Sequence, residues 1–381
     1  MDKKTIKVYV AMSGGVDSSV AAGLLKKQGY DVVGVFMKPW SAFAKASAGQ
    51  ASLCLWQQDR EDALRAASVL GIPMKTWDFS REYKKEVGDY MIREYRAGRT
   101  PNPDVMCNKE IKFGLFLKKA LKDGADFIAT GHYIRIKPRR GPAAPYPQGA
   151  PKSAPWGSPS RVTPFCLYMA KDKNKDQSYF LWTLTQKQLK YCLFPIGEYI
   201  KPEVRKMAKK FGLPNHDKKD SQGVCFIGSL DMKEFLKKYI KSKLGKIIDQ
   251  NGEVIGEHDG ACYYTIGQRH GLDIKNGHGP YYVVGKNLKK NVVYVGKEKD
   301  LGGGGAKISN ISWINTTWKL NFQVKKEAKV DVKIRYRSKS ERATLYKNGN
   351  LKFKNLVRAI TSGQSAVFYK GEEMLGGGII R

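Results

Sequence analysis

One short stretch, SGGVDSS at residues 13–19, constrains the fold of this chain more than any other. The run TIKVYVAM before it alternates Ile6, Val8 and Val10 and predicts a buried strand, while SSVAAGLLKKQG after it has helical spacing and ends at Gly29. A glycine-rich turn between a strand and a helix is typical of anion binding, because backbone N–H groups and the helix dipole point at the turn. The Walker pattern GxxxxGK[ST] is absent, so an ordinary P-loop is excluded.

The residue types in this stretch suit a phosphate group. Glycines let the backbone approach an anion closely, and the serines Ser13, Ser18 and Ser19 add hydroxyl donors. Asp17 is expected either to hold Mg²⁺ bound to the phosphates or to cap the helix. The stretch resembles the signature of the ATP pyrophosphatase (PP-loop) family, whose members cleave ATP between the α- and β-phosphates. The resemblance implies that the following residues contact the nucleotide, the last two near adenine at the ends of strands: Ala11, Met12, Ser13, Gly14, Gly15, Val16, Asp17, Ser18, Met37 and Gly131.

The pattern of strands and helices predicts an α/β fold. Strand-like runs at YDVVGVFM, MKTWDFS and DFIATGHY alternate with helical runs, which favours a doubly wound parallel sheet. From about residue 240, short β-branched and aromatic runs separated by Asn-Gly and Gly-rich turns predict antiparallel strands in small barrels. The glycine run LGGGGAK at 301–307 is expected to be a linker between two such units.

These patterns divide the chain into three predicted domains. The first, at 1–232, contains the glycine-rich turn and is expected to be catalytic, followed by a central β-rich domain at 233–300 and a C-terminal β-barrel at 301–381. Two segments rich in Ala, Gly, Ser or Pro, at about 41–53 and 137–164, are interpreted as insertions without chemistry of their own.

Charge and hydropathy limit the partners and the location. Lys and Arg number 68 against 35 Asp and Glu, giving a net charge of +33, which favours nucleic acid as a partner, although a generally lysine-rich proteome would produce the same excess. No apolar run approaches the roughly twenty residues of a membrane helix, and the N-terminus has no signal-peptide core. We therefore expect a cytoplasmic protein without a membrane partner.

The six cysteines show no CxxC pair and no zinc-type spacing with histidine. Cys107 and Cys225 each lie in a predicted turn, and Asp104 and Cys107 are expected just before a helix, where a thiol ionises more readily. Cys192, in the apolar YCLF, is interpreted as a core residue, and Cys54 as a structural one.

Six motifs occur in this order along the chain: SGGVDSS, GRTPNPDVMCNKEIKFG, ATGHY, KDKNKDQSYFLW, SQGVCFIG and GEHDGACYYTIGQRHGL. Together they resemble the tRNA-specific 2-thiouridylase (MnmA) family, over nearly the whole chain except the insertions. The resemblance implies that ATP adenylates the 2-carbonyl oxygen of the wobble uridine in tRNAs for lysine, glutamate and glutamine. A cysteine desulfurase, directly or through carriers, places a persulfide on Cys225. Either this persulfide, or sulfide released when Cys107 forms a disulfide with Cys225, adds to carbon 2, and AMP leaves.

The same resemblance implies that the central domain at 233–300 binds tRNA, and it assigns roles to further residues. Asp104 is expected to act as general acid/base on the uridine. His132 either contacts RNA or hydrogen-bonds within the core. Mg²⁺ is expected to arrive with ATP, without a fixed protein site. The implied contacts to the target base or tRNA are Asn102, Pro103, Asp104, His132, Lys175, Asp176, Gln177, Arg335, Tyr336 and Gln364.

Two other functions fit parts of the sequence. Another adenylating PP-loop enzyme would act on a small carbonyl compound without tRNA. A basic RNA-binding protein with an inactive loop would bind tRNA with steep salt dependence and would not turn over ATP.

Overall fold

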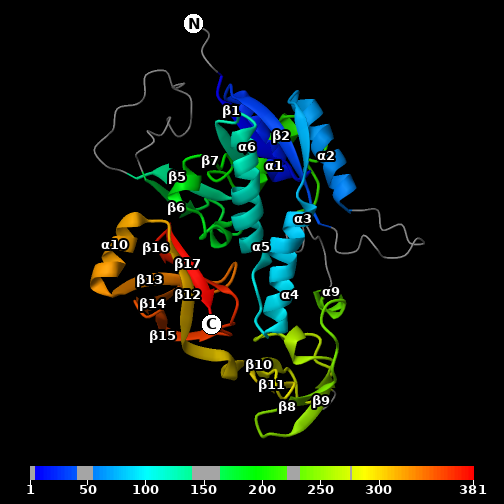
Figure 1. Ribbon diagram of the computed structural model, residues 1–381, viewed down its shortest axis with the longest axis vertical. Helices are drawn as coiled ribbons and strands as arrows, with labels where there is room; N and C mark the ends of the chain where they lie inside the picture. Colours follow the sequence, from blue (N-terminus) through cyan, green and yellow to red (C-terminus); the bar gives the residue numbers. More distant parts are fainter. Residues whose placement is uncertain (1–4, 41–54, 140–163, 221–231, 275–276) are drawn as a thin grey trace, which may run out of the picture.

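The computed structural model describes residues 5–40, 55–139, 164–220, 232–274 and 277–381. Figure 1 shows an α/β region that contains the N-terminal strands, with a β-rich region formed by the strands β8 to β11 and a second one formed by β12 to β17 on the side opposite the N-terminus.

A five-stranded sheet forms the centre of the α/β region, in the order β3-β2-β1-β4-β7, with every pair parallel. Successive residues of β1 enter two different cores: Val8 and Val10 pack beneath α1 and α2, whereas Tyr9 packs on the opposite face. Burial on both faces explains why these strands are continuous apolar runs. The predicted doubly wound sheet is confirmed. Its strands are β1 (Lys7–Ala11), β2 (Asp31–Lys38), β3 (Met74–Asp78), β4 (Phe127–Thr130) and β7 (Cys192–Leu193).

Helices cover both faces of this sheet. One face carries α1 (Val16–Lys27), α2 (Leu55–Leu70) and α8 (Lys201–Lys210). On the other face, two long helical stretches each contain a π-helical segment, and the two π segments contact each other. Such segments are rare and are often found at functional sites. The first stretch consists of α3 (Ser80–Tyr83), η1 (Lys84–Gly88) and α4 (Asp89–Arg96), and the second of α5 (Pro103–Met106), η2 (Cys107–Phe116) and α6 (Leu117–Lys122).

The central β-rich region is one four-stranded sheet in the order β10-β11-β8-β9. The prediction of purely antiparallel strands is wrong at one pair, because β11 runs parallel to β8. The chain between them forms β9, a short helix and β10, which returns β11 to the direction of β8. The elements here are α9 (Met232–Lys237), β8 (Gly245–Ile248), β9 (Val254–His258), η4 (Ala261–Tyr263), β10 (Tyr282–Asn287), β11 (Val292–Gly296) and η5 (Glu298–Leu301).

The C-terminal strands form the predicted barrel, closed by pairing of β12 with β17. The predicted linker at 301–307 is wrong, because most of it forms the start of β12 (Gly302–Trp313). A Cβ on Gly305 would lie 2.6 Å from the Leu351 carbonyl oxygen, so glycine here permits a close approach of β12 to β15 rather than flexibility. The remaining elements are α10 (Thr316–Lys325), β13 (Glu327–Lys333), β14 (Glu341–Tyr346), β15 (Asn350–Arg358), β16 (Ser365–Lys370) and β17 (Glu373–Ile380).

A hairpin from the α/β region extends this barrel. Strands β5 (Ile134–Pro138) and β6 (Phe165–Met169) pair antiparallel, and β6 also pairs with β17, through Leu167 opposite Met374. Together with the barrel strands they form one eight-stranded sheet. The chain then continues through η3 (Ser178–Phe180) and α7 (Gln186–Leu189). The α/β region and the barrel are therefore joined by backbone hydrogen bonds and not only by side chains.

Candidate active site

The glycine-rich loop lies at the carboxyl end of β1, where the chain enters α1 (Figure 1). Gly14 has a φ of +75°, a conformation that residues with side chains rarely adopt. A Cβ on Gly14 would lie 2.1 Å from the Asp59 carbonyl oxygen in α2, whereas a Cβ on Gly15 would approach only Ser13 Oγ, at 3.5 Å. Glycine is therefore required at position 14 by conformation and by packing, and much less at position 15.

Hydroxyl groups in the loop stabilise the loop itself. Ser18 Oγ accepts a hydrogen bond from the Ser13 amide at 3.2 Å and donates to the Gly15 carbonyl at 3.1 Å. Ser19 is fully buried; its hydroxyl donates to the Gly15 carbonyl at 3.0 Å and accepts from Asn215 Nδ2 at 3.1 Å. Of the three serines expected to face an anion, only Ser13 is exposed. Asn215 was not recognised from the sequence, because nothing near it in the chain indicates the loop.

Asp17 is held by two side chains from elsewhere in the fold. Its Oδ1 accepts hydrogen bonds from Tyr133 Oη at 2.9 Å and from Lys201 Nζ at 2.7 Å. No side chain caps α1, so the capping alternative for Asp17 is wrong. Lys201 Nζ also lies 2.7 Å from Asp220 Oδ1. The sequence analysis missed Lys201, which is separated from Asp17 by 184 positions.

Asp220 is surrounded by cations. Besides Lys201, it forms ion pairs with Lys175 and, at 3.4 Å, with Arg205. Burial alone would raise the pKa of Asp220, but the hydrogen bonds from Lys175 and Lys201 lower it to about 2. Asp220 directly precedes residues 221–231, which lie outside the described residues, and the predicted site residue Cys225 falls among them.

The two positions expected near adenine lie at the same edge of the sheet as the loop. Gly131 follows β4, and a Cβ there would lie 2.6 Å from the Ser18 amide nitrogen, so the strand end rests directly on the loop. Met37 is the penultimate residue of β2, and its side chain is buried in the core. Both backbones are at the carboxyl ends of strands, where ligands of open α/β sheets bind.

Residues suited to Mg²⁺ are few at this edge. Among the described residues there is no group of three or more His, Cys, Asp or Glu side chains that could hold a metal ion by itself. Asp17 supplies one carboxylate beside the phosphate loop, and Mg²⁺ commonly binds through one or two carboxylates together with substrate phosphates. The residues present therefore fit Mg²⁺ that is carried by ATP.

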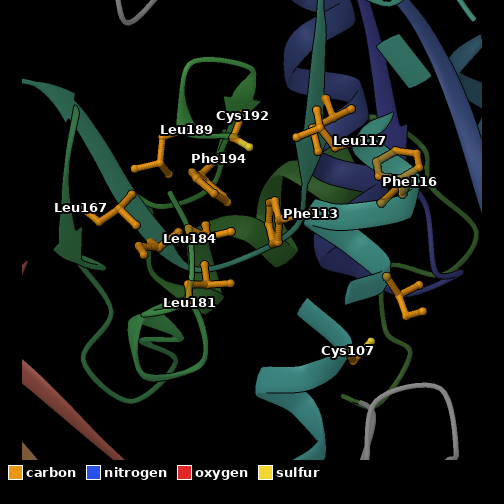
Figure 2. Close-up of a cluster of buried hydrophobic side chains, with 14 of the residues drawn as sticks. Cys107, Phe113, Phe116, Leu117, Leu167, Leu181, Leu184, Leu189, Cys192 and Phe194 are labelled. Atoms are coloured by element: carbon orange, nitrogen blue, oxygen red, sulfur yellow. The ribbon is translucent and has the colours of Figure 1, made fainter. Parts of the chain in front are cut away.

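A second candidate region surrounds the start of α5. Asn102 is the N-cap residue, and its Oδ1 accepts a hydrogen bond from the Val105 amide at 3.3 Å, while Pro103 occupies the first helical position. Asp104 and Cys107 were expected just before a helix, but both lie inside the helical stretch, because Asn102 and Pro103 start it earlier. Asp104 is in the first turn of α5, and Cys107 is the fully buried first residue of η2. Figure 2 shows Cys107 on the helical stretch that also carries Phe113 in the buried cluster.

Both β-rich regions hold the backbone that leads to this helix. The Thr100 amide donates to the Ser362 carbonyl at 2.9 Å, and Thr100 Oγ1 lies 3.0 Å from Thr265 Oγ1 in the central region. Gln364 Nε2, from the barrel, donates to the carbonyls of Thr100 and Pro101 at 3.0 and 3.2 Å. The predicted tRNA contact Gln364 therefore also positions the residues before Asn102.

Aromatic side chains also pack near the start of α5. The rings of Phe180 and Tyr336 lie 4.6 Å apart, and burial raises the pKa of the Tyr336 hydroxyl, with the charge of Asp104 acting in the same direction. Tyr179 Oη donates to the carbonyls of Ile334 and Ser365 in the barrel, at 3.2 and 2.9 Å. Tyr336, one of the predicted tRNA contacts, therefore packs against Phe180 beside the buried cluster that contains Cys107.

The remaining predicted tRNA contacts have partners inside the protein. Arg335 Nη2 donates to the carbonyls of Ile266 and Ala359, both at 2.9 Å, and so links the central region to the barrel. Asp176 is buried and accepts from Ser178 Oγ at 2.9 Å. Gln177 Oε1 accepts at 2.9 Å from the amide of Tyr133, the residue whose hydroxyl donates to Asp17.

His132, two residues after the end of β4, is buried. Its Nδ1 lies 2.8 Å from Thr130 Oγ1, and its ring packs against Phe113 and Phe194. Burial, and to a smaller extent the charge of Lys112, hold the pKa of His132 well below its usual value, so the imidazole is neutral. These contacts fit the core alternative, and an RNA contact by His132 stays a prediction.

Comparison with known proteins covers the whole chain. Three family profiles match in succession: a tRNA methyl transferase HUP domain at residues 6–229, a tRNA methyl transferase PRC-barrel domain at 233–297 and an aminomethyltransferase beta-barrel domain at 304–380. The tRNA-specific 2-thiouridylase MnmA of Bacillus licheniformis is 45% identical, over 98% of this chain and 94% of the relative. The protein of the same name from Bacillus thuringiensis is 44% identical over the same shares.

Similarity to solved structures is weaker. The structure of NMN synthetase from Francisella tularensis covers 62% of this chain and 77% of that chain, with 14% identity and a TM-score of 0.33. In the described residues, no helix combines the length and the apolar character needed to span a membrane.

Proposed function

The chain belongs to the tRNA-specific 2-thiouridylase family, and on this premise we propose that it replaces the 2-oxygen of a tRNA uridine with sulfur at the expense of ATP. The observation that carries the proposal is the match to relatives of that name over 98% of the chain, through all three domains. Two of the domain descriptions mention methyl transfer, but the relatives that match the entire chain are named for thiolation.

ATP supplies the activation step. The uridine 2-oxygen is a poor leaving group, so its attack on the α-phosphate forms an adenylate and releases pyrophosphate. In our proposal the loop from Ala11 to Ser18 binds the phosphates, and adenine lies beside Met37 and Gly131. Asp17 would hold Mg²⁺ on the phosphates, which neutralises charge that develops on the departing pyrophosphate.

Sulfur arrives as a persulfide on Cys225, from a cysteine desulfurase or a relay protein. The Cys107 thiolate attacks the inner sulfur of the persulfide, forming a Cys107–Cys225 disulfide and releasing hydrosulfide. Hydrosulfide adds to carbon 2 of the adenylated uridine, and the carbon–oxygen bond to AMP breaks. An external thiol then reduces the disulfide. In the alternative the terminal sulfur of the persulfide adds directly to carbon 2 and AMP leaves. The Cys107 thiolate then attacks Cys225 Sγ, which breaks the sulfur–sulfur bond, forms the Cys107–Cys225 disulfide and frees the 2-thiouridine.

The target uridine is placed by the residues at the start of α5. Asn102 and Pro103 would contact the base, and Asp104 would exchange protons with it as general acid/base. Anticodon bases are single-stranded and can be taken out of their stack at low energetic cost. We propose tRNAs for lysine, glutamate and glutamine as substrates, contacted also through residues Lys175, Asp176, Gln177, Arg335, Tyr336 and Gln364, with His132 nearby.

The function is tested by incubating the protein with unmodified tRNA, MgATP and a persulfide source, followed by mass spectrometry of the nucleosides. We expect a mass gain of sulfur for oxygen at the wobble uridine, together with AMP and pyrophosphate. Cys225→Ala should lose this activity and keep MgATP binding, whereas Cys262→Ala, outside the proposed site, should keep both. A fully active Cys225→Ala protein would refute the persulfide assignment, and pyrophosphate release without tRNA would favour a different adenylating enzyme.

A further inference from the structure

The phosphate loop of this chain lacks the lysine that follows the glycines of a Walker P-loop, yet a lysine reaches the loop from another part of the fold. Lys201 is the first residue of α8, and its Nζ lies 2.7 Å from Asp17 Oδ1. Its side chain is only 11% exposed. A desolvated ammonium directed at the first turn of α1 is an uncommon arrangement for a lysine, which is mostly found on the surface.

The surroundings hold Lys201 in this direction. The Lys201 amide donates to Asp172 Oδ2 at 2.9 Å, and the other oxygen of Asp172 accepts from the backbone amides of the next turn, so the start of α8 is fixed to that turn. The ammonium itself lies between two carboxylates, Asp17 and Asp220, each at 2.7 Å. Asp220 has two further cationic partners, Lys175 and Arg205, and is therefore not dependent on Lys201 for charge compensation.

Lys175 and Arg205 already compensate the negative charge of Asp220, so neutralising that carboxylate does not by itself explain the position of Lys201. We propose that Lys201 is a phosphate-binding residue of the ATP site and supplies, from α8, the positive charge that a Walker lysine supplies from within its own loop. The inference rests on the function proposed above and deepens it. A phosphate group on the glycine-rich loop would lie beside the first turn of α1, within a small side-chain movement of the ammonium.

The proposed role concerns the two phosphates of ATP that depart as pyrophosphate. Lys201 would pair with the β- and γ-phosphates, stabilise the charge that develops on pyrophosphate, and contribute little to binding AMP. Asp17 would then be free to bind Mg²⁺, since the ammonium that occupies its Oδ1 would have moved to the phosphates. Exchange of one anionic partner for another keeps the ammonium paired throughout.

The test compares ligand binding by Lys201→Met and by the wild type, using MgATP, inorganic pyrophosphate with Mg²⁺, and AMP in isothermal titration calorimetry. We expect Lys201→Met to weaken MgATP and pyrophosphate about 10- to 100-fold, the usual effect of losing a charge-assisted hydrogen bond, and to leave AMP affinity within about twofold. Lys201→Arg should recover part of the loss. Unchanged MgATP and pyrophosphate affinities in Lys201→Met would overturn the proposal.

A structural role for Lys201 is distinguished by a double variant. If Lys201 only neutralises carboxylates, Lys201→Met/Asp220→Asn restores the net charge of the cluster formed with Asp17 and should restore MgATP binding to the level of Asp220→Asn alone. If Lys201 binds phosphate, the double variant stays as weak as Lys201→Met. Should Lys201→Met fail to fold, as seen by circular dichroism, the double variant and Lys201→Arg decide between the two outcomes.

Lys171→Met is the matched control for the loss of charge. Lys171 lies near the same end of α8 and pairs with Glu203 at 3.3 Å, but its side chain is half exposed and does not touch Asp17. It should leave all three affinities unchanged. Thiolation by the wild type, measured in parallel, separates the two proposals: phosphate binding that depends on Lys201 in a protein that makes no 2-thiouridine would refute the function and keep this inference.

Discussion

The glycine-rich loop and the backbone from Thr100 to Cys107 are built in different ways. Among the described residues, the side chains from other elements that hydrogen-bond to the loop, those of Tyr133, Lys201 and Asn215, come from the α/β region. Thr100 is instead held by the central region through its side-chain hydroxyl and by the barrel through its backbone. The difference suggests that ATP can be bound by one domain, whereas the target base is positioned only when all three are assembled around it.

The largest effect is expected on the sulfur step. Cys107→Ser should lower thiolation at least about 10³-fold, because a hydroxyl is a far weaker nucleophile toward sulfur than a thiolate, and should leave MgATP affinity unchanged. Nucleoside mass spectrometry and calorimetry measure the two properties. Cys192→Ala is the control, since this cysteine is buried in β7 and has no proposed role. Loss of MgATP binding in Cys107→Ser would show that the two regions are not separable.

A smaller loss is expected from the proposed acid/base group. Asp104→Asn keeps the size of the side chain but cannot take up a proton, so the thiolation rate should fall about 10²- to 10⁴-fold. The tRNA affinity, measured by filter binding, should change little. An Asp104→Asn protein with wild-type rates would remove Asp104 from the chemistry and leave it as a helix-start residue.

Gly14→Ala should weaken MgATP binding at the glycine-rich loop and leave the region from Thr100 to Cys107 unchanged. The added Cβ would require a strained φ and would collide with the Asp59 carbonyl, so we expect MgATP affinity to fall about tenfold or more, with tRNA affinity unchanged. Gly15→Ala is the matched control, because its φ is −87° and its Cβ has room. Equal effects of the two variants would contradict the assigned geometry.

Gln364→Ala tests the link between the barrel and the base site. Losing two hydrogen bonds to the carbonyls of Thr100 and Pro101 should cost about 1–3 kcal/mol of positioning free energy, which appears as a reduction in kcat of roughly 5- to 160-fold. If Gln364 acts mainly as a tRNA contact, KM for tRNA should rise instead. Thr100→Val, which loses the contact with Thr265, should show a smaller decrease in kcat.

The smallest effect concerns acid stability near the loop. The pKa of Asp220 is lowered to about 2 from 3.8, so its ion pairs stabilise the fold above about pH 4, and this contribution disappears as the pH falls toward 2. Asp220→Asn should therefore lower Tm by a few degrees at neutral pH and by much less near pH 2, as measured by circular dichroism. A difference in Tm that does not depend on pH would refute the ion-pair explanation.

Much of the fold could be predicted because its signals are local. Strand β1, the glycine turn and α1 follow one another in the chain, so a short stretch identifies the parallel sheet and the phosphate loop. The glycines of β12 could not be interpreted locally, since their reason is a close contact with β15. The parallel pair β8–β11 could not be predicted either, because the alternation of side chains along a strand does not reveal the strand's direction.

The sites divide in a similar way. Asp104, Cys107 and the loop residues could be nominated from their motifs, whereas Lys201 lies in none of them. Tyr133 and Thr100 do lie in motifs, but their roles become visible only from the side chains opposite them. Arg335 and Gln364 illustrate a second limit of prediction from motifs. A motif can nominate a residue for RNA contact, but the structure shows that both also connect parts of the protein.

The pairing of β6 with β17 has a consequence for how the chain is made. Leu167 lies opposite Met374, so one edge of the hairpin in the catalytic region stays without its partner strand until almost the entire chain has left the ribosome. Pairing over such a sequence distance is slow, and an unpaired strand edge invites association with other chains. We therefore expect synthesis to be more prone to aggregation when it stops before β17, and chaperone demand to be greatest for C-terminally truncated products.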